Sequence, residues 1–244
     1  MPISPDAAAL YPDIAAHGSL FALLRAETAG RLADASVMPD DTNPQRATIA
    51  ATLSWREPLL VIATSYQRDW LIVGSDSFQK LPLIHGRTED PSAVAQAAIA
   101  WHDGASLDAI CAAAPFVHRS GRYEVRDRDP DRLTDSEWQS LRRDAADMEV
   151  DGKVHQQALI EAAHADPVLR GLYPFTSHWA LCFSTTTRPD MTIVGPCVAA
   201  GANGTYTVGD HHSDAPDHFP TAGEAVAEAV RRLPSGLGSV TLGV

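Results

Sequence analysis

The sequence has few cysteines, few lysines and no long apolar run. Its three cysteines include no C-x-x-C pair, so they cannot form the disulfide framework of a small secreted domain. We therefore expect free, buried cysteines and a cytoplasmic location. No run of about eighteen apolar residues is present, which predicts that no helix spans a membrane. The first residues also lack the basic and apolar regions of a secretory signal.

Motifs that bind common cofactors are also missing. The chain contains no phosphate-binding glycine loop, no Gly-x-Ser-x-Gly nucleophile elbow and no protein kinase signature. We therefore expect no cofactor. Positive charge is scarce, because 19 basic residues face 31 acidic ones and give a net charge of −12. Nucleic-acid binding needs clustered Lys and Arg, so we expect no nucleic-acid partner.

The composition that remains is that of a globular protein. The chain has 244 residues, 45% hydrophobic and 20% charged, which suits one large domain or two small ones. Hydrophobic periodicity predicts helices and strands in both halves of the chain. The expected helices are residues 6–33, 88–104, 107–117, 136–148, 154–165 and 221–233, with one more turn at 169–173. The expected strands are residues 46–55, 59–66, 69–74, 180–184, 191–199 and 204–209.

Two stretches of the chain resemble each other. DWLIVG at residues 69–74 corresponds to TYTVG at 205–209, and a turn-rich connection and an alanine-rich helix follow each. Internal repeats determine architecture, although alanine-rich helices also agree by chance. We predict an α+β fold with two related halves, each a small antiparallel sheet covered by helices. The halves are residues 1–118 and 136–244, and a charged linker joins them at 119–135.

The strongest candidate site is the segment LYPFTSHWALCFSTTT, residues 172–187. Histidine is the side chain best suited to acid–base chemistry near neutral pH. We therefore predict His178 as the acid or base, with Tyr173, Thr176 and Ser177 orienting a substrate. If the segment is a strand, the adjacent Ser177 and His178 point to opposite sides and cannot form a nucleophile–base pair.

Alternation along the same segment predicts two different faces. His178, Ala180, Cys182 and Ser184 make a small or polar face, whereas Trp179, Leu181 and Phe183 make a large apolar one. The apolar face belongs in the core, and the polar face could line a cavity. The predicted substrate-binding residues are Cys182, Ser184 and Trp179. Alternatively, Thr176, Ser177 and His178 only cap the chain between Pro174 and the strand.

The loop GDHHSDAPDH, residues 209–218, carries possible metal ligands. His211, His212 and His218 could bind a transition metal. Adjacent histidines diverge in an extended chain, and no known metal-binding spacing is present. A solvated loop explains the composition more simply, so we predict no metal site.

The segment LYPFTSHWALCFS, together with PCVAA, GTYTV and TAGEAVAEAVRRLPSGLG, resembles an actinobacterial family of unknown function. Members of that family are labelled natural product biosynthesis proteins. RDWLIVG and TEDPSAVAQAAIAWHDGASLDAICAAAPFV fit its general pattern, so the resemblance runs from about Leu10 to the C-terminus. It implies a biosynthetic setting and no particular reaction.

Three functions remain open. The first is a tailoring enzyme, a cofactor-independent cyclase or isomerase that acts on a natural-product intermediate or a ribosomal precursor peptide. The second is a non-catalytic partner of a precursor peptide, a carrier or another enzyme of the pathway, binding by strand addition or charge. The third is an immunity protein that neutralises a toxin, which rests on composition alone.

Overall fold

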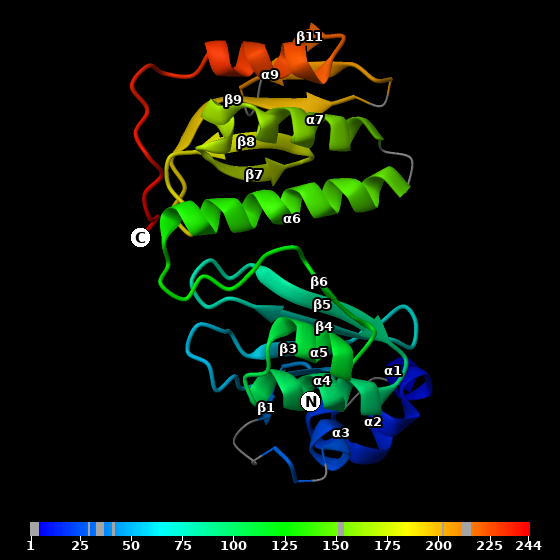
Figure 1. Ribbon diagram of the computed structural model, residues 1–244. Coiled ribbons are helices and arrows are strands. Elements are labelled where there is room, and N and C mark those ends of the chain that lie inside the picture. Colours follow the sequence, from blue (N-terminus) through cyan, green and yellow to red (C-terminus); the bar gives the residue numbers. More distant parts are fainter. Residues whose placement is uncertain are drawn as a thin grey trace. The chain divides into compact units, whose positions relative to one another are not determined.

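The computed structural model describes residues 5–28, 30–32, 37–40, 42–150, 154–201, 203–210 and 216–244. The chain divides into two units, Met1–Ser120 and Gly121–Val244. Each unit contains one antiparallel sheet accompanied by helices (Figure 1). The fold is therefore α+β with two sheet-containing halves, as predicted.

The N-terminal unit begins with three short helices in place of the single helix expected over residues 6–33. The first break precedes Pro12, which suits the first turn of a new helix. The second break is at Gly18, which has φ 82°, and at Ser19, whose hydroxyl accepts a hydrogen bond from Ala22 N–H. The helices are α1 (Pro5–Leu10), α2 (Pro12–His17) and α3 (Leu20–Glu27).

A six-stranded antiparallel sheet follows, with its strands in sequence order. Its strands are β1 (Val37–Pro39), β2 (Arg46–Ile49), β3 (Leu59–Ala63), β4 (Trp70–Ser75), β5 (Pro82–Thr88) and β6 (Val117–Arg119). Helices α4 (Pro91–His102) and α5 (Leu107–Ala113) lie between β5 and β6 in the chain. Trp70 on β4 and Trp101 on α4 are fully buried in the core that the sheet and the helices share.

Strand β5 had no counterpart among the expected strands, because it contains Pro82, His85 and Gly86, which are not typical of a strand. Gly86 has a packing reason. A Cβ there would lie 2.6 Å from the carbonyl oxygen of Phe116, so glycine allows the chain before β6 to approach closely.

The C-terminal unit places three helices before its sheet and one after it. The helices are α6 (Pro130–Val150), α7 (Val154–Ala165), α8 (Pro167–Arg170) and α9 (Ala222–Arg231). The strands are β7 (Tyr173–Ser177), β8 (Ala180–Ser184), β9 (Ile193–Ala200), β10 (Tyr206–Gly209) and β11 (Asp217–Phe219). They form an antiparallel sheet in the order β11-β10-β9-β8-β7.

Residues 121–135, predicted as part of a linker, belong to this unit. Helix α6 begins at Pro130, and the segment before it packs on that helix. Arg122 makes two hydrogen bonds of 2.6 and 2.8 Å to the carboxylate of Glu137, and the two side chains are only 14% and 5% exposed. Tyr123 N–H donates to Ser136 Oγ at 3.0 Å. The charge of Arg122 therefore serves packing.

The two similar stretches of sequence occupy matching places in the two units. DWLIVG contains β4 and TYTVG contains β10, and each is followed by the last strand of a meander and then by a helix, α4 or α9. Thr221 caps α9 with a hydroxyl that accepts from Glu224 N–H. Among the described residues, no helix is both long and apolar enough to cross a membrane.

Candidate functional site: the β7–β8 hairpin

The predicted site segment folds as a β-hairpin. Strand β7 pairs with β8 in a register that places Ser177 opposite Ala180 and Tyr173 opposite Ser184. The helical turn expected at 169–173 lies slightly earlier, as α8 at Pro167–Arg170, and the sequence did not predict strand β7 at Tyr173–Ser177. Pro174 cannot donate to a central ladder, but β7 is the edge strand of its sheet, where proline is tolerated.

His178 and Trp179 form the two-residue turn of the hairpin. Their φ angles are 49° and 73°, and a type I′ turn requires positive φ at both central positions. Asn-Gly is the usual pair there, and a bulky residue in this region is an outlier. Such strain costs on the order of 1–3 kcal/mol a residue and is found often at functional sites. The turn is therefore the first place to look for a function.

The turn also brings together Ser177 and His178, which the sequence argument had separated. Ser177 Oγ lies 3.3 Å from His178 Nδ1. The expectation that they could not pair assumed a strand through His178, but the left-handed backbone at His178 rotates the imidazole back toward Ser177. The contact is long for a hydroxyl–imidazole hydrogen bond, and His178 is exposed.

Trp179 lies at the tip and is 59% exposed. Its parity predicted that it would share the core face with Leu181 and Phe183, and only those two are buried, at 0% each. The backbone of Trp179 is tied to the body of the unit, because Gln156 Nε2 on α7 donates to its carbonyl oxygen at 3.3 Å. Gln156 itself is largely buried.

The remaining candidate residues are spread along the hairpin. Cross-strand partners place Tyr173, Ser177 and Ser184 on one face of the sheet, whereas Thr176 pairs with Leu181 and lies on the other face. Tyr173 and Ser177 are four residues apart on one strand, which corresponds to about 13 Å. A small substrate at His178 therefore cannot also reach Tyr173.

Two of the candidates are covered in the folded state. Tyr173 and Ser184 are fully buried. Ser184 Oγ donates to the carbonyl oxygen of Thr186 at 2.7 Å and accepts from Thr186 N–H at 3.1 Å. Ser184 thus holds the start of the β8–β9 connection. Ser177, His178, Trp179 and Thr176 remain at the accessible end.

Cys182 is bonded to Cys197. The two cysteines form a disulfide between β8 and β9 with a Cα–Cα distance of 4.4 Å. The expectation of three free cysteines was therefore wrong, and among the described residues Cys111 is the cysteine that lies outside this disulfide. The disulfide packs with Phe175, Ala180 and Met191 on the sheet face opposite the helices. It stabilises the strand that carries the tip.

A buried ion pair lies near the base of the hairpin. Burial lowers the pKa of Arg122, but the hydrogen bonds and charge of Glu137 outweigh this effect and leave the pKa raised. Electrostatic interactions with Tyr173 and Asp144 also raise the pKa of Arg122. Arg122 therefore stays charged at every physiological pH, and it secures α6 without serving as a proton donor.

The histidine-rich loop falls largely outside the described residues, since His211 and His212 are not among them. His218 is described. It lies exposed on β11 opposite Thr207. Within the described part of the chain, no three His, Cys, Asp or Glu side chains are grouped to hold a metal ion.

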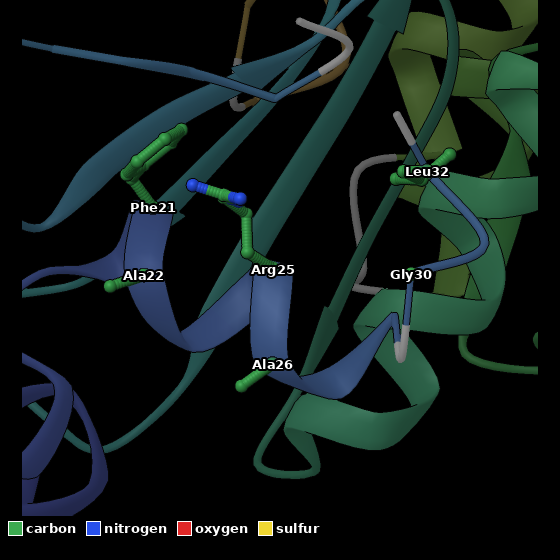
Figure 2. Close-up of a pocket in the computed structure, with 6 residues that line it drawn as sticks. All are labelled: Phe21, Ala22, Arg25, Ala26, Gly30 and Leu32. Atoms are coloured by element: carbon green, nitrogen blue, oxygen red, sulfur yellow. The ribbon is translucent and has the colours of Figure 1, made fainter. Parts of the chain in front are cut away.

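The N-terminal unit contains a cavity of about 340 Å³ beside α3, between that helix and the chain at Gly30 and Leu32. Figure 2 shows Phe21 and Arg25 on the same side of α3, with Ala22 and Ala26 nearby. The Arg25 guanidinium lies 5.6 Å from the Phe21 ring centroid, and Arg25 makes a further interaction. Among the described residues that line the cavity, Arg25 is the one titratable side chain, so we assign the cavity no chemistry.

Two residues that matter at the hairpin were missed from the sequence. Gln156 is one residue in a helix with no motif around it. Cys197 was visible as a cysteine, but its partner depends on the register between β8 and β9, which is irregular between Leu181 and Phe183.

Residues 132–244 match a family of unknown function (DUF6193). The match begins inside α6 and covers the hairpin, so similarity to a family of unknown function is found in the C-terminal part of the chain. The match does not bear on the actinobacterial origin or on the biosynthetic label. No curated protein and no solved structure matches the chain. The C-terminal unit is therefore similar to a family whose function is not known.

Proposed function

We propose that this protein is a recognition component in the biosynthesis of a natural product, and that its β7–β8 turn contacts a precursor peptide or another intermediate. The observation that supports the proposal best is Trp179, 59% exposed on a two-residue turn. Exposed tryptophans act as anchors in binding sites because they bury a large area at a small entropic cost. The biosynthetic setting comes from the sequence resemblance alone.

The neighbours of Trp179 suit such a role. Thr176, Ser177 and His178 directly precede Trp179 in the chain and are at least partly exposed, and their two hydroxyls and imidazole can bond to the backbone of a bound peptide. The hydrogen bond from Gln156 fixes the turn before a ligand arrives, which reduces the entropic cost of binding. The net charge of −12 favours fast association with a basic partner.

A titration of the full chain with the precursor of its pathway tests the proposal. Replacing Trp179 by Ala removes the anchor and should weaken binding by at least tenfold. Tyr66→Ala is the matched control, because Tyr66 is an aromatic residue 95% exposed in the N-terminal unit, and it should leave the affinity unchanged. Equal affinity of Trp179→Ala and the unmodified protein would contradict the role of the turn.

A second candidate function is general acid–base catalysis by His178, favoured by the 3.3 Å contact to Ser177. In this alternative the turn binds the intermediate and the imidazole moves a proton during a cyclisation or isomerisation. Mass spectrometry of the product should then show turnover that His178→Ala abolishes and Ser177→Ala reduces. Binding with no change of mass or retention time supports recognition alone.

We also propose a cytoplasmic location. In a reducing cytoplasm Cys182 and Cys197 would be largely thiols, although they form a disulfide in the structure. Alkylating the protein in intact cells before lysis, and then measuring its mass, distinguishes the two states. A fully oxidised pair would place the protein in an oxidising compartment.

A further inference from the structure

The sheet of the N-terminal unit has two different faces. Its inner face supplies Ile49, Leu59, Val61, Trp70 and Ile72 to the buried core. Helices α3, α4 and α5 contact each other and the sheet, and Figure 1 shows them together on one side of it. The alternate residues point the other way. We call them the outer sheet face: Met38, Arg46, Thr48, Leu60, Ile62, Leu71, Val73, Ser75, His85, Arg87 and His118.

The centre of the outer sheet face is aliphatic. Leu60 on β3 lies opposite Val73 on β4, and Ile62 lies opposite Leu71. These four side chains are all partly exposed, and none belongs to the buried core of the unit or packs against it. A block of four aliphatic side chains on a sheet surface is typical of a binding surface.

The rim of the face carries two arginines and two histidines. Arg46 and Arg87 flank the aliphatic centre on β2 and β5. His85 and His118 lie opposite each other beyond Val73, with ring centroids 6.4 Å apart. Strands β1 to β6 contain no Asp or Glu at all, in a chain with 31 acidic residues. The carboxylates of Asp40 and Asp69, just beyond the ends of β1 and β4, pair with the two arginines.

The two arginines keep donors for a ligand. Arg46 lies 3.6 Å from Asp40, and Arg87 Nη1 lies 2.9 Å from Asp69. Their side chains are nevertheless 46% and 58% exposed. A guanidinium has five N–H donors, and each of these ion pairs engages one nitrogen. The remaining donors can bind a carboxylate in a bidentate manner.

We propose that the outer sheet face docks a segment of a partner protein in which aliphatic side chains are flanked by carboxylates. The aliphatic residues of that segment cover Leu60, Ile62, Leu71 and Val73, and its carboxylates bind Arg46 and Arg87. A second copy docked through the same face would bring these arginines against identical ones, which is unfavourable. This proposal is independent of the β7–β8 turn, which lies in the other unit.

Two synthetic amphipathic peptides test the proposal, one built from Leu, Ala and Glu and the other with Lys in place of every Glu. With methyl-labelled full-length protein, the Glu peptide should shift the NMR signals of Leu60, Ile62, Leu71 and Val73. The Lys peptide should bind at least tenfold more weakly. Val73→Asp should weaken binding of the Glu peptide at least tenfold. Ile193→Asp, at a position 47% exposed in the other unit, should leave this affinity unchanged.

Arg46→Glu provides a variant that leaves the aliphatic centre intact and lies at an exposed position, so it should fold normally. It should reverse the preference toward the Lys peptide. Equal binding of the two peptides, or no binding of either, overturns the proposal. Binding of anionic vesicles in place of the peptide, or a dimer that Val73→Asp dissociates, also overturns it, because the face would then serve a membrane or a second copy.

Discussion

Single residues in the N-terminal core are held by contacts that leave no room for another atom. A Cβ on Gly74 would lie 2.5 Å from Cζ3 of Trp101 and 2.8 Å from Cγ1 of Ile84. Gly74→Ala should therefore lower the free energy of unfolding by about 1–3 kcal/mol, measured by urea denaturation. Gly223→Ala is the control, because nothing lies within 4 Å of its Cβ in α9. It should stabilise the protein slightly, and similar losses in both variants would contradict the packing argument.

His164 provides a pH-dependent test at the same scale. Burial lowers its pKa from 6.5, and the charge of Arg142 acts in the same direction. The ring meets Trp138 edge-on at a centroid distance of 5.4 Å. The unfolded chain therefore takes up this proton at a higher pH than the folded protein. The stability that the neutral ring contributes is present above pH 6.5 and is lost as the pH falls through the lowered pKa.

An NMR titration of the His164 ring should give a midpoint below 6.5. Between pH 6.5 and the lowered pKa, His164 contributes to the decrease in the free energy of unfolding as the pH falls. His164→Gln should remove that contribution. A midpoint at or above 6.5 would show that the ring is better solvated than its burial indicates.

Individual residues were predictable where one short-range rule decides their place. Thr221 before an alanine-rich helix is a cap for that reason, and Leu181 and Phe183 alternate onto the core face. The bond between Cys182 and Cys197 was not predictable, because it depends on how two strands align after folding. Spacing along the chain carries no information about that alignment.

At the scale of elements, the β7–β8 hairpin combines a strained turn with an exposed aromatic residue. The double variant His178→Asn, Trp179→Gly has the residues that a type I′ turn prefers. It should raise the free energy of unfolding by about 1–2 kcal/mol, since the left-handed conformation costs about that much per ordinary residue. The same variant should lose binding of the precursor. A loss of stability would mean that the Trp179 side chain supports the fold.

The disulfide is the second feature of this sheet that can be tested by itself. Cys182 and Cys197 are 15 residues apart, and closing a loop of that length restricts the unfolded chain by about 3 kcal/mol. Reduction should lower the free energy of unfolding by about that amount in the intact protein. In the double variant Cys182→Ala, Cys197→Ala, a reducing agent should have no effect. Stability that is insensitive to reduction would contradict a closed disulfide in the folded protein.

Helices and strands were predictable where their sequences are typical of that type of element. The β-branched runs of β3 and β4 and the alanine-rich α4 and α9 lie where periodicity indicated them. Strand β7 was missed because Pro174 discourages a strand and His178-Trp179 carries no turn signal. The segment of the candidate site was therefore predicted with the wrong geometry, and His178 and Trp179 lie in a turn because the ends of β7 and β8 pair.

At the scale of the whole molecule, the chain consists of two units with separate cores. One core contains Trp70 and Trp101, and the other contains Trp138 and Phe183. The candidate turn belongs to one unit and the outer sheet face to the other. The two proposals can therefore fail or succeed separately, because each surface has its own variants and its own ligand.

The family match and the structural unit differ at their start, and this difference is testable. The match begins at residue 132, whereas the unit begins at Gly121. Residues 121–131 contain Arg122, which neutralises the buried carboxylate of Glu137. Removing one partner of a buried ion pair costs about 3–5 kcal/mol. We therefore expect a fragment of residues 121–244 to fold and a fragment of residues 132–244 to be less stable by about that amount.

Urea denaturation of the two fragments measures this difference. Arg122→Ala in the longer fragment should reproduce most of the loss. Glu137→Gln in the shorter fragment should recover part of it, because an unpaired amide is less costly to bury than an unpaired carboxylate. If both fragments are equally stable, the ion pair contributes nothing net and the unit starts at α6. If the shorter one is destabilised as expected, the charged segment before α6 is part of the folded unit, and Arg122 is the residue that ties it there.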